Sequence, residues 1–215
     1  MMQGPGSMGG MDMNVLSQRL RRLATLDTSV FDEVRGDPAA TAPAVVVAVV
    51  STLLFGLGGW LWWAFNGPDY PGYETQGDIF LKSFIVGSII SIVLWLVWLG
   101  ITYVVLTQLF RARGDIQELI RVTGFAAAPL ALGVIMFIPQ LEFAIALTAV
   151  ALFFGATVIA VQAATDAPAG RTLVAVGAGF AVWAIVLSLF VSDENIYAPG
   201  LFIFETGAEI LRKLG

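Results

Sequence analysis

Cysteine and histidine are both missing from this chain of 215 residues. Without cysteine no disulfide framework can form, and the soft ligands of structural zinc sites are absent too. Without histidine the chain lacks the usual base that activates a serine nucleophile, and it lacks the ligand pair of metalloproteases. These absences exclude the commonest hydrolase chemistries, and nothing in the composition implies a metal or a cofactor.

Charge is also scarce in this sequence. Charged residues make up 13% of the chain and hydrophobic residues 58%, and the mean hydropathy is +0.84. This composition lies far from that of a soluble globular protein. The net charge is −5, whereas a nucleic-acid partner would need a clustered basic face, so we expect no nucleic-acid binding.

Apolar runs dominate what is present. About 20 residues suffice to cross a hydrocarbon core of roughly 30 Å, and five runs are long enough. Barrel strands would alternate apolar and polar residues, whereas these runs are apolar on all sides. We therefore predict an all-α, polytopic transmembrane helical bundle with five spans, at about residues 41–65, 79–110, 116–138, 142–162 and 171–191.

Local signals mark the ends of several spans. Asp37 before Pro38 is typical of a helix N-cap followed by proline in the first turn. Asp115, with Glu118 three residues later, predicts a capping box at the third span. Pro139 separates the third and fourth spans, which must form a tight antiparallel hairpin.

The segments outside the spans have their own patterns. We expect residues 1–13 to be a disordered leader and residues 14–37 to form a cytoplasmic, interfacial helical segment. Leucines recur there at helical spacing while Arg19, Arg21 and Arg22 occupy other faces, which fits either a helix on an anionic surface or an ordinary solvated helix. Residues 192–215 predict an amphipathic tail on the outer surface, with a re-entrant segment as the alternative.

Basic residues indicate the orientation, because short cytoplasmic loops carry the Lys and Arg excess. Arginines precede the first span and recur between the second and third, whereas the loop 66–78 is acidic. We expect a multi-pass protein of the cell inner (plasma) membrane, with the N-terminus cytoplasmic and the C-terminus outside. Its most direct partner is membrane lipid, and other membrane proteins or self-association are further options.

Few side chains in the spans could carry chemistry. No Asp or Glu lies deep in a span, so paired-carboxylate catalysis has no residues to use, and we predict no catalytic residue and no enzyme activity. Glu118 and Arg121, three residues apart, are expected to pair at the interface. Pro129 predicts a helix kink near the middle of the third span, unless bundle packing accommodates it.

One stretch resembles a known family. A small-residue turn enters a helix that bears a Gly-aromatic pair followed by proline, in the run Arg113-Gly114, Glu118-Leu119-Ile120-Arg121, Gly124-Phe125 and Pro129. This run resembles the signature of the Yip (Ypt-interacting protein) domain family, and Val30-Phe31 and Asp37-Pro38 are similar to its prokaryotic branch. The resemblance covers roughly residues 26–191. Eukaryotic relatives are five-span proteins with a cytoplasmic N-terminus, associated with Rab-type GTPases and vesicle traffic, so it implies that topology.

Three functions remain open from the sequence. The first is a non-enzymatic membrane adaptor or organiser that acts through protein or lipid contacts. Its docking surface would gather the cytoplasmic charges at Arg19, Arg21, Arg22, Arg111, Arg113, Glu118 and Arg121. The second is a small transporter, channel or lipid-moving protein with the third and fourth spans lining its path. The third is an accessory subunit of a larger membrane complex.

Overall fold

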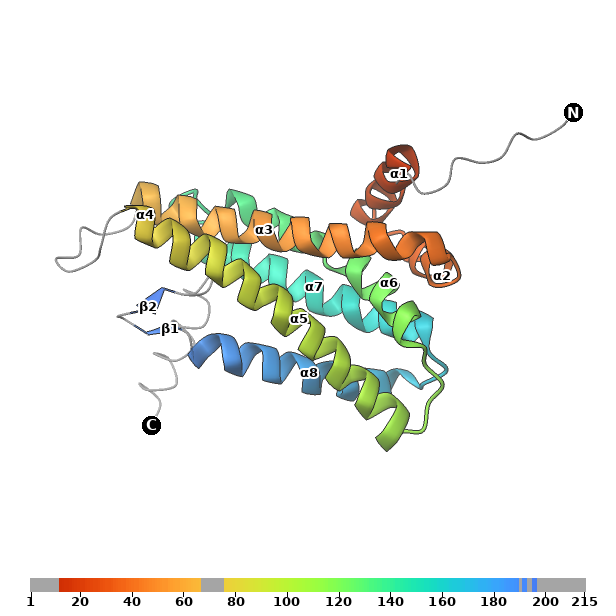
Figure 1. The fold of residues 1–215 in the computed structure, drawn as a ribbon. Helices are drawn as coiled ribbons and strands as arrows, with labels where there is room; N and C mark the ends of the chain where they lie inside the picture. Colours follow the sequence, from red (N-terminus) through yellow and green to blue (C-terminus); the bar gives the residue numbers. More distant parts are fainter. Residues whose placement is uncertain (1–11, 67–75, 190, 193–194, 197–215) are drawn as a thin grey trace, which may run out of the picture.

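The computed structural model describes residues 12–66, 76–189, 191–192 and 195–196. Within these residues, five helices are long and apolar enough to cross a membrane. They run side by side as a bundle (Figure 1), and the prediction of an all-α polytopic fold is confirmed. The five segments are Pro38–Asn66, Gly77–Leu109, Ile116–Ile135, Glu142–Ala164 and Ala169–Leu187.

The elements follow the predicted order with shifts at their ends. The first helix begins at Met13, inside the predicted leader, because the Asp12 carboxylate accepts hydrogen bonds from the backbone N–H groups of Asn14 and Val15. The N-terminal elements are α1 (Met13–Ala24), α2 (Ser29–Arg35), η1 (Pro38–Ala40) and α3 (Thr41–Asn66). Then follow α4 (Gln76–Ile79), η2 (Phe80–Val86), α5 (Gly87–Val104), η3 (Val105–Leu109), α6 (Ile116–Ala126), η4 (Ala128–Ile135), α7 (Glu142–Ala164) and α8 (Ala169–Leu189).

Both predicted carboxylate caps are present. Asp37 accepts a hydrogen bond from the Ala39 N–H and opens η1, which leads directly into α3. Asp115 accepts hydrogen bonds from the N–H groups of Gln117 and Glu118 at the start of α6. These bonds satisfy backbone donors that have no partner within the helix.

The third span contains a change of helix type where a kink was predicted. The α-helix α6 ends at Ala126, and the 3₁₀ helix η4 begins at Ala128 with Pro129 in its first turn. Proline has no N–H to donate and its ring clashes with the carbonyl four residues earlier, which disfavours a regular α-helix through this point. The 11 residues of α6 and 8 residues of η4 rise about 1.5 and 2.0 Å each, together about 33 Å, a length comparable with the thickness of the hydrocarbon core.

Small residues let the spans approach closely. A Cβ on Gly58 of α3 would collide with the backbone carbonyl of Gly133 in η4, and one on Gly124 of α6 would collide with Ala44 of α3. Gly179 of α8 lies against Trp98 of α5 in the same way. These small-residue contacts serve packing within the chain.

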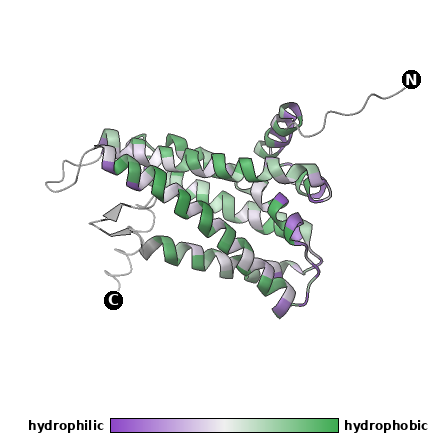
Figure 2. Ribbon diagram, in the orientation of Figure 1, coloured by the Kyte–Doolittle hydropathy of each residue, from purple (hydrophilic) through white to green (hydrophobic). Residues whose placement is uncertain are grey.

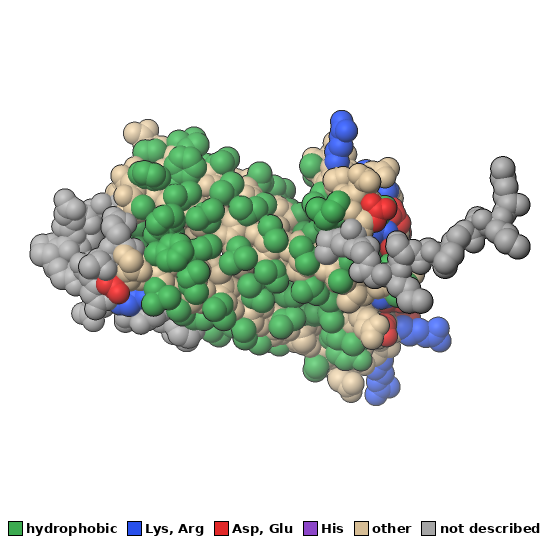
Figure 3. Space-filling model, turned by 45° about the horizontal axis from the view of Figure 1, so that its top comes forward, with side chains coloured by type: hydrophobic (Ala, Val, Ile, Leu, Met, Phe, Trp, Pro, Cys, Tyr) green, Lys and Arg blue, Asp and Glu red, His purple; other side chains and the backbone are tan. Residues whose placement is uncertain are grey.

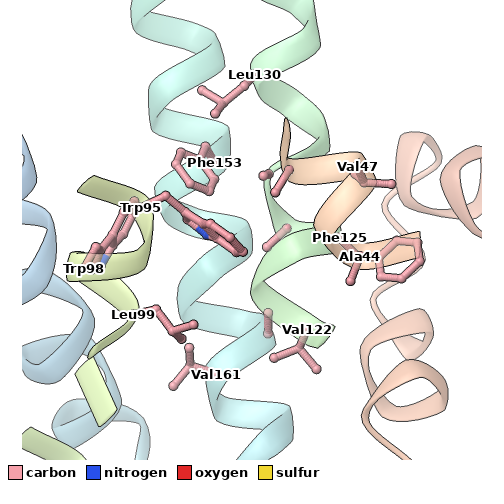
Figure 4. Packing of buried hydrophobic residues seen from close by; sticks show 14 of the residues in the cluster. Ala44, Val47, Trp95, Trp98, Leu99, Val122, Phe125, Leu130, Phe153 and Val161 are labelled. Carbon is pink, nitrogen blue, oxygen red and sulfur yellow. The ribbon is translucent and has the colours of Figure 1, made fainter. Parts of the chain in front are cut away.

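Aromatic side chains fill the rest of the core. Trp98 is fully buried, and its indole N–H donates to the Val176 carbonyl at 2.9 Å. Its ring meets Phe153 edge-on, with the centroids 5.0 Å apart. Figure 4 shows Trp95, Phe153 and Leu130 close together in the same region. The spans are thus joined by close backbone contacts at some levels and by large rings at others.

Several hydroxyl groups in the spans bond within their own helices. Thr52 donates to the Ala48 carbonyl, Thr123 to Leu119 and Thr157 to Phe153, each at 2.7 to 2.8 Å. These i to i−4 bonds allow a polar side chain to lie in an apolar bundle without a partner on another helix.

The end of the described chain contains a short pair of strands. Val191–Ser192 (β1) pairs antiparallel with Asn195–Ile196 (β2), and this two-stranded turn was not predicted. The expected amphipathic segment lies otherwise outside the described residues, as does most of the predicted leader.

Candidate docking face at the arginine-rich end

One end of the bundle carries most of the described charges. Figure 3 shows an apolar belt over the spans with arginines and carboxylates gathered at this end, and Figure 2 shows the matching hydrophilic colouring of α1 and α2. The helix α2 packs here against α6 and α7. Its apolar residues Val30, Phe31 and Val34 are fully or almost fully buried, so α2 closes this end of the bundle.

An ion-pair network fastens α1 to α2. The Arg19 guanidinium contacts Glu33 and Asp37, both at 2.8 Å, and its side chain is 9% exposed. Arg22 contacts Asp27 at 2.8 Å and Glu33 at 2.6 Å. Arg19 and Arg22 therefore hold the helices together, and their charges are already compensated. This narrows the predicted docking surface, because among the α1 arginines Arg21 alone has no ion pair within the described residues.

The network shifts the titration of its carboxyl groups. Hydrogen bonds from the Ser29 hydroxyl and from Arg22 lower the pKa of Asp27 to about 2. Arg19, and after it Arg22, lowers the pKa of Glu33. The hydrogen bond from Arg19 also lowers the pKa of Asp37, and the nearby charge of Arg121 adds to this effect. All three groups therefore favour the charged form in the folded protein.

Arg121 lies deeper than the other arginines. It is 6% exposed, and its Nε atom is buried without a hydrogen-bond partner in the described residues. The predicted pair with Glu118 is absent there, since no ion pair joins the two side chains. Arg121 instead lies near enough to Asp37 to influence its pKa, so α6 turns this charge towards the N-terminal segment.

The connection between η3 and α6 forms an exposed elbow. Arg111 has a φ of 53° and an exposed side chain. The backbone N–H of Arg113 donates to an Asp166 carboxylate oxygen at 2.8 Å, which ties the elbow to the loop between α7 and α8. The Arg171 guanidinium carbon lies 5.7 Å from the centre of the Phe110 ring, in a cation–π contact. The backbone of this elbow is held in place while its arginine side chains remain at the surface.

The exposed arginines together define a basic rim. Arg35 joins it from α2, and its guanidinium donates to the Ala163 carbonyl at the end of α7. The docking surface predicted from the sequence did not include Arg35 or Arg171. We use the term basic rim for Arg21, Arg35, Arg111, Arg113 and Arg171.

The bundle also encloses a small cavity. It has a volume of about 20 Å³ and lies between α3, α5, η4, α7 and α8. Thr52 and Ser91 are polar residues in its lining, and their hydroxyls donate to carbonyls of their own helices. This volume suits about one water molecule.

The comparisons with known proteins agree with the fold. The family model of the Yip1 domain matches residues 24–192, which include all five spans and the helix α2. The searches of curated proteins and of solved structures gave no match. Because the family match extends over most of the chain, this protein belongs to the Yip1 domain family.

Proposed function

We propose that this integral membrane protein is a non-enzymatic adaptor that docks an acidic surface of a cytoplasmic protein on its basic rim. The observation that carries the proposal is the elbow, where Arg111 and Arg113 are exposed on a backbone tied to the neighbouring loop, with the exposed Arg171 of α8 in contact with Phe110 beside it. A rigid display of guanidinium groups suits recognition of carboxylates, because each group offers several donors in a fixed plane. The excess of arginine supports a cytoplasmic position for this end.

Photo-crosslinking tests the proposal. A photo-reactive residue replaces Gln117, which is exposed in the first turn of α6 beside the elbow. We expect discrete cross-linked products in cells, and their loss when Arg111 and Arg113 are both replaced by Glu. The control with both arginines replaced by Lys keeps the charge and should retain the products in part.

Two results of this experiment would contradict the docking proposal. Products that survive the double Glu substitution would show that the rim is not the docking surface. Cross-links to lipid alone would show an organiser of the bilayer in place of a protein adaptor. Because charge reversal beside a span can invert topology, the orientation of the Glu variant is checked in the same cells.

Permeation has less support than docking. The cavity beside η4 has room for about one water, and the threonine and serine hydroxyls in its lining are bonded within their own helices. A transporter usually carries ionisable groups along its path. We expect proteoliposomes of this protein to give background flux of ions and background lipid exchange.

A role as an accessory subunit has no feature of its own to support it. The closest small-residue contacts, at Gly58, Gly124 and Gly179, are used between spans of this chain. An adaptor therefore should retain its folded bundle when purified without partners, whereas a subunit that depended on foreign helices would not.

A further inference from the structure

Leu26 occupies a backbone position that normally selects glycine. The Leu26 N–H bonds to the Leu23 carbonyl and the Asp27 N–H to the Arg22 carbonyl, the two bonds of a Schellman motif that ends α1. Leu26 stands at the left-handed position of this motif with a φ of 62°. Glycine or asparagine adopts this conformation readily, whereas a leucine there is strained by its Cβ.

The side chain gains nothing from the described protein in return. Leu26 is 80% exposed, the highest value among the large hydrophobic residues of the described chain. The strained backbone and the exposed leucine side chain each raise the free energy of this turn in water. The choice of leucine becomes favourable only if the side chain enters an apolar phase.

The position of α1 places the turn next to such an apolar phase, the lipid bilayer. This helix runs at a steep angle to the spans, at the end of the bundle where α3 begins (Figure 1). In that part of α3, Val45, Val46 and Val50 are exposed side chains of a membrane span. A helix placed in this way lies along the bilayer surface, next to the lipid-facing belt of the bundle.

The charge pattern of α1 suits the same location. Leu16, Leu20 and Leu23 form its buried or half-buried apolar face, and the ion pairs of Arg19 and Arg22 compensate the charges nearest to that face. Arg21 lies on the other side of the helix and is exposed, where it can meet lipid phosphates. Compensation of Arg19 and Arg22 lowers the cost of placing the apolar face of α1 at shallow depth.

We infer that the α1–α2 turn is a membrane anchor, with Leu26 inserted among the acyl chains of the leaflet on the arginine-rich side. The helix α1 then lies in the headgroup layer. The occupant of this surface is phospholipid, and the inference does not rest on docking of a protein at the basic rim. The spans remain the main attachment to the membrane. The inserted turn fixes the depth of the N-terminal hairpin in the bilayer.

Spin labels can measure this depth, since a chain without cysteine accepts single labelled cysteines without background. One label is placed at Thr28, which is exposed and makes no capping hydrogen bond, and another at Gln18, which is exposed on α1. The full chain is reconstituted in bilayers of phosphatidylcholine with phosphatidylglycerol. Accessibility to oxygen, which concentrates in the acyl chains, is compared with accessibility to a water-soluble nickel chelate.

We expect the oxygen-to-nickel ratio at position 28 to fall several-fold in Leu26→Asn and to stay near its original value in Leu26→Met. The ratio at position 18 should report the headgroup or aqueous side throughout. In detergent, Leu26→Asn should be at least as stable to heat as the parent chain, because asparagine suits the positive φ. This control separates a loss of anchoring from a loss of folding.

Two outcomes overturn the inference. A water-like ratio at position 28 in the parent chain would show that the turn lies outside the bilayer. Equal ratios for leucine, methionine and asparagine at position 26 would show that the side chain does not set the depth of the hairpin.

Discussion

At the residue scale, the arginines of this protein have three different roles. Arg19 and Arg22 bind carboxylates of the same hairpin, Arg121 is buried without a partner for its Nε atom in the described residues, and the side chains of the basic rim are exposed on the protein. The sequence shows all of them as one positive end. Their separation depends on which carboxylates the fold brings near, and this is where structure adds most to the functional argument.

Acid should loosen the N-terminal hairpin. Asp27, Glu33 and Asp37 have pKa values below their usual range in the folded protein, so the unfolded hairpin binds more protons as pH falls. Their contribution is complete above about pH 4.5, the ordinary range of these groups, and is lost as pH falls towards the value of about 2 for Asp27. Protease cleavage of residues 12–37 in vesicles, measured from pH 6 to 2, should rise across this window. A flat profile would contradict the network.

Two buried arginines should respond in opposite ways to the same substitution. Arg19→Met removes a cation from Glu33 and Asp37, and we expect a loss of about 1–3 kcal/mol in unfolding free energy, reduced by the partial exposure of both carboxylates. Arg121→Met removes a buried charge that lacks a direct ion pair within the described residues, so we expect little change or a gain. Thermal unfolding in detergent compares the two variants. Equal losses would show that Arg121 is held by a bond of similar strength.

The local signals at this scale could be predicted from the sequence, and the distant pairs could not. Asp37 and Asp115 form caps because a carboxylate needs only the next few backbone N–H groups. The bond between Arg19 and Asp37 spans 18 positions and exists only because α1 folds back on α2. The sequence signal for these ion pairs was a basic helix followed by a turn and acidic residues. The same pattern is equally typical of a solvated hairpin.

At the element scale, backbone contact between spans is as important as side-chain packing. The five spans follow from length and hydropathy, since an unbroken apolar run has few other stable forms in lipid. The 3₁₀ helix η4 could not be predicted from Pro129 alone, because a kinked α-helix satisfies the same residue. Gly133 of η4 approaches Gly58 of α3 so closely that a Cβ on Gly58 would collide with it.

Glycine substitutions test this approach. Gly58→Ala places a methyl group into the Gly133 backbone, which cannot move aside easily, so we expect a loss of about 1–3 kcal/mol despite the better helix propensity of alanine. Gly155→Ala is the matched control on α7, with nothing within 4 Å of the new Cβ, and it should be neutral or stabilising. Unfolding in mixed detergent micelles measures both. A neutral Gly58→Ala would mean that α3 and η4 lie further apart than described.

At the scale of the whole molecule, the described structure separates the membrane domain from its two ends. An apolar belt covers the face of the spans seen in Figure 3, the N-terminal hairpin and the basic rim lie at one end, and the tight turn after η4 lies at the other. The match to the Yip1 domain family extends over all five spans. The docking proposal requires the basic rim to lie on the cytoplasmic side of the membrane, because only there can it bind a cytoplasmic protein.

Single-cysteine labelling of intact cells tests that requirement most directly. A cysteine at Arg113 represents the basic rim, and one at Gln140, exposed in the turn before α7, represents the opposite end. With a membrane-impermeant maleimide, the account predicts labelling at position 140 in intact cells and labelling at position 113 only after permeabilisation. Labelling at position 113 in intact cells, with protection at position 140, would place the rim outside and contradict the adaptor function.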